Sequence, residues 1–263
     1  MVTLAGIFPP TQPPEQIGAV AAAAESAGLE QLWIWEDCFM ESGIATATAM
    51  LATTSRITVG IGLLPVPLRN VALTAMELAT LSRLFPGRLI AGVGHGVLDW
   101  MGQAGARVES PMTLLREYTA ALYALLHGET VTTRGRYVNL DAVALDWPPA
   151  VVPPLLVGGI KPRTVSLAGE LADGVIIPGG VSPEEVRTSV GQLHGQRSTG
   201  RGPADVVVFI STPAGRPAAA VAATVSEYAA AGATHVAVNA AEDDADLERF
   251  AGFLAREDGP LLR

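Results

Sequence analysis

The amino-acid sequence predicts a single-domain (β/α)8 barrel spanning residues 1–263. Short β-branched runs alternate with alanine- and leucine-rich stretches along the chain, a pattern typical of βαβ units with a parallel sheet. Most of the runs are continuously apolar, as expected of strands covered on both faces. Eight such units close into a barrel, whereas the rival architecture, an open doubly wound sheet, usually has about five to seven strands.

The predicted strands and helices alternate strictly. The strands cover residues 3–8, 31–37, 57–64, 88–94, 154–158, 173–178, 205–212 and 234–239. Six helices cover residues 14–27, 44–53, 71–85, 162–171, 217–231 and 244–256, and two more begin at Pro111 and Pro183. Ser110-Pro111 combines an N-cap residue with proline at the first helical position, and Gly128 ends that helix. Its apolar face recurs with helical spacing at Leu114, Leu115, Tyr118, Ala121, Leu122, Leu125 and Leu126.

Two further segments carry local signals. Ser182 to Glu185 form a capping box at the start of the helix that begins at Pro183. Residues 128–153 break the alternation with a stretch rich in threonine, valine and proline. Within it, 131–133 and 137–140 predict a small hairpin outside the barrel. An irregular proline-rich connection is the alternative.

Composition and charge narrow the classes of function. The formal net charge of −9 argues against binding nucleic acid or an anionic membrane surface. The chain begins without a basic, then apolar, leader pattern, and no run approaches the ~20 apolar residues that span a bilayer. Cys38 is the single cysteine, so no intramolecular disulfide is expected. These observations predict a soluble, cytoplasmic protein that binds neither nucleic acid nor a membrane surface.

In such barrels the active site lies where the strands end. The first, second and fourth predicted strands are followed by candidate substrate-pocket residues, namely Phe8, Trp35, Cys38, Asp99 and Trp100. Gly158-Gly159 and Gly179-Gly180 each precede a predicted helix, so backbone N–H groups and a helix N-terminus would face one point. This arrangement favours a phosphate, with Lys161 or Arg163 as counter-charge, although glycines also simply make tight turns.

A third glycine cluster suits a flat ring. Gly92-Val93-Gly94-His95-Gly96 has G-x-G-x-G spacing, whereas the dinucleotide fingerprint needs G-x-G-x-x-G. We also expect no helix directly after it, since the next cap is Ser110. The four histidines are scattered, so no metal site is predicted. Carboxylates at the mouth are limited to Glu36, Asp37 and Asp99, which indicates that a cofactor supplies the reactivity.

These residues resemble a known family. The run 60–70 (GIGLLPVPLRN), its continuation through 79–94, the segments 153–159 and 168–174, and the early stretches 23–28 and 33–37 are similar to the bacterial-luciferase-like oxidoreductases. The resemblance follows nearly the whole chain in order. It implies a barrel that binds FMN or the deazaflavin coenzyme F420 and carries out hydride or oxygen chemistry.

The resemblance also implies a set of site residues. The family commonly has a non-proline cis peptide at the end of the third strand, here Gly62–Leu63. The residues expected to bind the cofactor are Gly62, Leu63, Gly94, His95, Val157, Gly158, Gly159, Pro178, Gly179 and Gly180. The implied phosphate position near the late strands agrees with the glycine pairs.

The chain departs from its relatives at two positions. Many deazaflavin-dependent relatives have a histidine where this chain has Cys38, and some have a glutamate where it has Val97. His95 and Asp37 are therefore the remaining catalytic candidates, with structural hydrogen bonding as the alternative role for each. The short 213–217 loop, where others carry a long lid, predicts an open site.

The resemblance implies a homodimer that pairs through early helices, and the small residues Thr46 to Ala49 would suit such packing. The expected function is oxidoreduction of a small organic substrate through F420 or FMN, with O2 as an additional substrate if the enzyme is a monooxygenase. Two alternatives are a barrel lyase or isomerase acting on a phosphorylated substrate and a non-catalytic flavin- or F420-binding protein.

Overall fold

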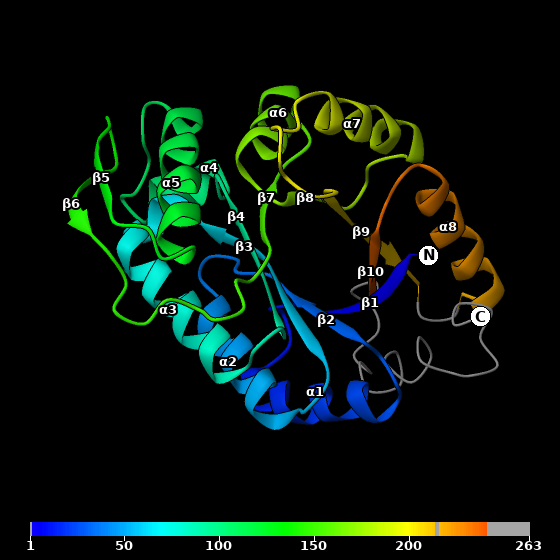
Figure 1. Ribbon diagram of the computed structural model, residues 1–263. Coiled ribbons are helices and arrows are strands. Elements are labelled where there is room, and N and C mark those ends of the chain that lie inside the picture. Colours follow the sequence, from blue (N-terminus) through cyan, green and yellow to red (C-terminus); the bar gives the residue numbers. More distant parts are fainter. Residues whose placement is uncertain (1, 214–215, 241–263) are drawn as a thin grey trace.

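Eight parallel strands close into a barrel in the computed structural model, which describes residues 2–213 and 216–240 (Figure 1). The order around the barrel is β1-β10-β9-β8-β7-β4-β3-β2. The strands are β1 (Thr3–Phe8), β2 (Gln31–Ile34), β3 (Thr58–Pro65), β4 (Leu89–Gly94), β7 (Leu155–Gly158), β8 (Gly174–Ile177), β9 (Asp205–Thr212) and β10 (His235–Ala240). The predicted barrel is confirmed. The second strand is shorter than expected, since residues 35–37 have left the sheet.

Helices surround the barrel on its outer face (Figure 1). They are α1 (Ile17–Ser26), which a 3-10 turn η1 (Pro14–Gln16) precedes, α2 (Gly43–Thr53), α3 (Val71–Leu84), α5 (Pro111–Leu126), α6 (Pro162–Leu171), α7 (Pro183–Gly195) and α8 (Ala218–Ala230). The capping box at Ser182 is present. The helix expected over 244–256 lies outside the described residues. Among the helices described, none is both long and apolar enough to cross a membrane.

Helix α5 begins at Pro111 as predicted, but its cap differs. The Ser110 hydroxyl lies 2.8 Å from Thr113 Oγ1 and accepts no backbone N–H. All seven residues of the predicted apolar face are buried. Burial of that face therefore stabilises the helix in place of a side-chain cap.

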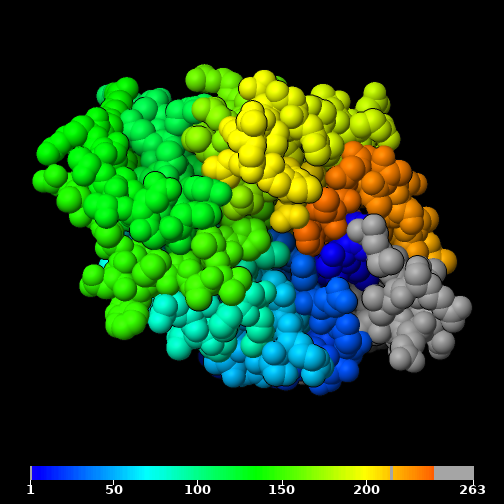
Figure 2. Space-filling model, in the orientation of Figure 1, coloured from blue at the N-terminus to red at the C-terminus, as the bar shows by residue number. Residues whose placement is uncertain are grey.

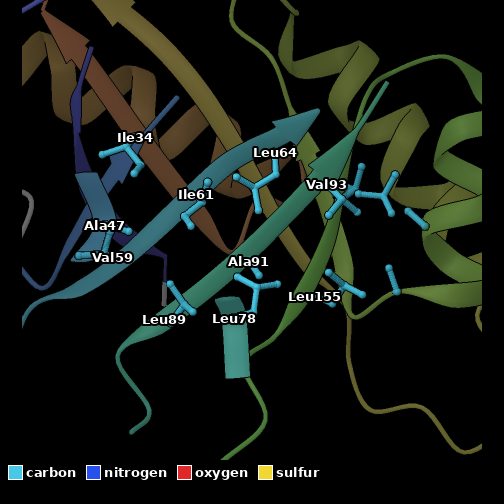
Figure 3. Close-up of a cluster of buried hydrophobic side chains, with 14 of the residues drawn as sticks. Ile34, Ala47, Val59, Ile61, Leu64, Leu78, Leu89, Ala91, Val93 and Leu155 are labelled. Carbon is cyan, nitrogen blue, oxygen red and sulfur yellow. The ribbon is translucent and has the colours of Figure 1, made fainter. Parts of the chain in front are cut away.

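Side chains of alternate strand residues form two cores. The larger core lies between strands and helices, and Figure 3 shows part of it around Ile61, Leu78 and Val93. The smaller core fills the barrel with Ala5, Ile7, Trp33, Ile90, Leu156, Ile176, Val207, Phe209 and Ala237. The inward residues of each strand are two apart, as strand geometry requires. This alternation decides which residues at a strand end can reach the barrel mouth.

The predicted hairpin is confirmed, and it lies outside the barrel. Strands β5 (Val131–Arg134) and β6 (Asn139–Val143) pair antiparallel. The Glu117 carboxylate of α5 accepts hydrogen bonds from the backbone N–H groups of Arg136, Tyr137 and Val138 at 2.9, 2.8 and 3.0 Å. These bonds hold the hairpin against α5, and its residues form one flank of the molecule, in green (Figure 2).

Two short elements were not predicted. A 3-10 turn, η2 (Val66–Leu68), follows β3, and α4 (Leu98–Gln103) begins four residues after Gly94. The expectation that no helix opens between the glycine cluster and Ser110 is therefore wrong. Helix α4 begins after Val97, which offers no capping side chain, so the sequence carried no start signal there. The helix does not alter the G-x-G-x-G spacing, which differs from the dinucleotide fingerprint.

Candidate active site

A cavity of about 520 Å³ opens at the carboxyl ends of six strands, β2, β3, β4, β7, β8 and β9. Its walls come from residues that lie inward in the barrel or follow the strand ends. They are Trp35, Glu36, Asp37, Gly62, Leu63, Pro65, His95, Gly96, Val97, Trp100, Gly158, Gly159, Ile176, Pro178, Gly179 and Phe209. The cavity therefore lies where barrel enzymes place their active sites.

Leu63 forms one wall and depends on two glycines. The Gly62–Leu63 peptide is cis, as the resemblance implied, and the pairing of β3 with β4 shifts register between Ile61 and Leu64. A Cβ added to Gly94 would lie 2.5 Å from Leu63 Cδ2, and one added to Gly158 would overlap the same atom. Only residues without a side chain at these two positions leave room for the Leu63 side chain.

Aromatic rings form the base of the cavity. Trp33 is fully buried beneath it, and its ring meets the ring of Phe209 edge-on at 5.6 Å between centroids. The Trp35 ring lies 6.0 Å from that of Phe209. Trp35 Nε1 is buried and has no hydrogen-bond partner among the residues that the structure describes. An indole N–H in this position is available to a polar atom of a bound molecule.

His95 follows β4 and is half-buried. Its Nε2 lies 3.5 Å from Thr164 Oγ1, and its Nδ1 is buried without a well-formed hydrogen bond. Burial lowers the pKa of His95, a contact with the Pro111 carbonyl opposes this effect, and the charge of Lys161 reinforces it. The imidazole is therefore neutral at pH 7 and can accept or donate a proton at the cavity wall.

Two carboxylates follow β2, and their surroundings differ. Glu36 receives both Nη atoms of Arg69, with Nη2 donating to Oε2 at 3.1 Å, and it also accepts from the Gly43 N–H at 2.6 Å. The Arg69 side chain makes a second ion pair with Glu77, at 3.4 Å. Asp37 takes part in no ion pair among the described residues, and burial raises its pKa. The charge of Glu36 is therefore balanced by that of Arg69, while Asp37 is the carboxyl group of the cavity wall that has no ion-pair partner among the described residues.

A second cavity of about 870 Å³ adjoins the first. The two share His95, Gly96, Gly159 and Pro178. Cationic side chains line the second cavity, namely Arg107, Lys161 and Arg163, and α6 begins there at Pro162. A helix N-terminus with nearby cations attracts an anionic group.

Most of the sequence-predicted site residues line the first cavity. They are Trp35, Asp37, Gly62, Leu63, His95, Trp100, Gly158, Gly159, Pro178 and Gly179. Phe8 and Val157, which were also expected there, do not line it. Both are buried in the core between strands and helices, because their neighbours Ile7 and Leu156 take the inward positions.

Four other predicted residues also lie off the cavity wall. Gly94 instead makes room for Leu63. Gly180, which has a φ of +82°, is part of the exposed turn before α7. The Asp99 side chain is 89% exposed and pairs with Arg107 at 3.2 Å. Cys38 is half-buried beside the cavity, and burial together with Glu36 and Asp37 raises the pKa of its thiol.

Six residues of the cavity wall had been assigned no site role from the sequence: Glu36, Pro65, Gly96, Val97, Ile176 and Phe209. The first four lie at or just after predicted strand ends, and Glu36 and Gly96 had been placed at the mouth, whereas Ile176 and Phe209 were not considered. Phe209 lies in the middle of β9, whereas the site residues were predicted from the ends of strands. The alternation that places Val207 inward also places Phe209 inward, so the period-two pattern could have found it.

Residues 2–260 match the family model described as luciferase-like monooxygenase. The chain is 31% identical over 202 residues to a 5,10-methylenetetrahydromethanopterin reductase of Methanolobus tindarius. This match covers 76% of the chain but only 61% of the relative's length.

Two solved structures have the same fold. An F420-dependent tetrahydromethanopterin reductase from Methanopyrus kandleri has a TM-score of 0.81 at 20% identity, over 97% of this chain and 98% of the other. A 3,6-diketocamphane monooxygenase from Pseudomonas putida in complex with FMN has a TM-score of 0.79 at 13% identity, over 100% and 99%. At these sequence identities the structural similarity establishes a shared fold and nothing about activity.

Proposed function

The chain belongs to the luciferase-like monooxygenase family, and from this premise we propose that it is an oxidoreductase that binds coenzyme F420 or FMN at the barrel mouth. One observation carries the proposal. An apolar, aromatic cavity and a cationic cavity meet at His95 and Gly159. This pair of cavities fits a molecule with a flat ring at one end and an anionic side chain at the other.

The residues present fit such a cofactor. Leu63, seated against Gly94 and Gly158, offers an apolar support. Among the described residues Trp35 Nε1 is buried without a hydrogen-bond partner, and His95 Nδ1 is buried without a well-formed one. Gly159 and Lys161, with the start of α6, would hold the phosphate. When bound, the cofactor supplies hydride or oxygen chemistry. The chain itself binds, orients and shields it from water.

We assign acid–base work to His95 and Asp37. His95 is neutral because burial lowers its pKa, and Asp37 holds its proton more readily than an exposed carboxyl because burial raises its pKa. Both line the same cavity. A neutral imidazole and a carboxyl group that line one cavity are suited to accepting and donating protons there. Replacing either should lower turnover more than cofactor affinity.

Between the two cofactors, the second cavity favours F420. It is larger than the first and carries three cationic side chains against one carboxylate, Glu109, which is paired with Arg136. F420 has a longer and more acidic side chain than FMN, so it would use more of this cavity.

Titrating the protein with each cofactor, and following quenching of protein fluorescence, tests the proposal. F420 should bind more tightly than FMN, and Lys161→Ala should weaken F420 at least about 10-fold. Arg187→Ala is the matched control, since Arg187 is exposed on α7 outside both cavities. If neither cofactor binds, the proposed function is wrong.

A non-catalytic cofactor carrier is the second candidate. It is favoured by Cys38, since the thiol stands where many relatives have histidine and does not line the cavity. Steady cofactor turnover with any organic substrate would exclude a carrier.

We also propose a homodimer in the cytoplasm. Thr46 and Ala47 of α2, expected at the contact, are buried within the chain. The exposed apolar residues Leu73 and Met76 of α3 offer a better contact surface. Light scattering should give twice the chain mass, and Met76→Lys should halve it. A monomeric wild-type protein would refute the dimer.

A further inference from the structure

We infer that the first cavity, beside the cofactor ring proposed to occupy part of it, admits an uncharged, largely apolar organic substrate and excludes phosphorylated or carboxylated ones. The inference rests on the proposed function for the identity of the site. It concerns which molecules the cavity wall accepts, so it can fail while cofactor binding succeeds.

The cavity wall is mostly apolar. Trp35, Leu63, Val97, Trp100, Ile176 and Phe209 provide rings and aliphatic groups on several sides. At the rim, Val97 is 47% exposed and Leu98, the next residue, is 54% exposed. A molecule that enters therefore exchanges its hydration shell for contact with apolar side chains. This exchange favours binding of an apolar molecule and disfavours binding of an ion.

No cation on the described part of this wall is free to meet an anion. Arg69 is bound to Glu36 and Glu77, and it lines a different cavity, between η2 and the hairpin. His95 is neutral at pH 7. The three cations of the site, Arg107, Lys161 and Arg163, all line the adjoining cavity.

The unpaired charge of the wall is negative. Asp37 takes part in no ion pair among the described residues, so it would repel an anion in the cavity. Two like charges about 5 Å apart near a protein surface repel strongly enough to weaken binding roughly 100-fold. A cation would be attracted to Asp37, but a single half-buried carboxylate does not offset the cost of removing an ammonium group from water.

Three size-matched probes test the inference: cyclohexanol, cyclohexanecarboxylate and cyclohexylammonium. Each is titrated by calorimetry at pH 7 into the protein loaded with the cofactor that binds. We expect cyclohexanol to bind best and the carboxylate roughly 100-fold more weakly. If neither cofactor binds, the proposed function falls, and the same titrations on the protein alone still test the wall.

Asp37→Asn removes the repelling charge while keeping the side-chain shape. It should strengthen carboxylate binding at least about 10-fold and leave cyclohexanol within about twofold. Asp99→Asn is the matched control, because Asp99 follows β4 but points to solvent beside Arg107. It should change neither affinity.

Four results would overturn the inference. They are carboxylate binding within about 10-fold of cyclohexanol, tighter binding of the ammonium probe, no binding of any probe, and an Asp37→Asn variant that folds but binds the carboxylate no better. The wild-type titrations decide the question even if the variant does not fold.

Discussion

Replacing Gly94 with alanine tests how tightly the Leu63 side chain packs against this glycine. The new Cβ would lie 2.5 Å from Leu63 Cδ2, 3.1 Å from Cδ1 and 3.3 Å from Cγ. The first distance is about 1 Å short of normal carbon–carbon contact. Leu63 cannot move toward Gly158, where it already fills the space of a missing side chain. Its end must therefore move into the cavity.

Overpacking of this kind costs about 1–3 kcal/mol of unfolding free energy. For a chain of this size that corresponds to a melting temperature lower by roughly 3–10 °C. Because Leu63 is displaced into the cavity, F420 should bind at least about 10-fold more weakly. Calorimetric melting and cofactor titration measure the two effects.

A double-mutant cycle with Leu63→Ala isolates the contact. Once the Leu63 branch is removed, Gly94→Ala should cost almost nothing, which gives a coupling energy of about 1–3 kcal/mol. Gly191→Ala on α7 is the control, since a Cβ there meets nothing within 4 Å, and it should stabilise slightly. A Gly94→Ala variant that melts and binds like the wild type would refute the reasoning.

Three further predictions concern charge. Arg69→Met leaves Glu36 and Glu77 buried without their partner, so urea unfolding should show a loss of about 3–5 kcal/mol, and a smaller loss would mean that water reaches the pair. Glu25 is partly buried, which raises its pKa, but three consecutive backbone N–H groups outweigh this and lower the pKa to about 2. Its stabilisation should be complete above about pH 4.5 and lost as the pH falls toward 2, and Glu25→Gln should flatten acid unfolding over that range. The pKa of His95 is lowered by burial, so the unfolded chain binds its proton first as the pH falls below about 6.5; melting temperature should drop there, and His95→Gln should remove part of that slope.

The sequence predicted the barrel well because each strand carries its own signal. The bounds of β1 and β9 match the expected residues, since polar or turn residues flank both apolar runs. Inward and outward positions were harder to assign. Phe8 ends its strand as a site residue would, yet only its pairing register turns it away from the mouth.

Long-range contacts were beyond local reasoning. Arg69 and Glu36 are 33 residues apart, and nothing near either residue indicates the pair. Helix α4 also escaped notice, because packing and the bond from Arg107 to the Leu98 carbonyl hold it rather than a cap.

Lys161 offers a single site for labelling with amine-reactive reagents. It is the only lysine in the sequence, and its exposed side chain lies at the cationic cavity beside the start of α6. Amine-reactive dyes will therefore label one side chain, with the N-terminal amine as the sole competitor. An anion bound in that cavity would shield the amine from the reagent. The rate of labelling therefore reports occupancy of the cavity without any introduced residue.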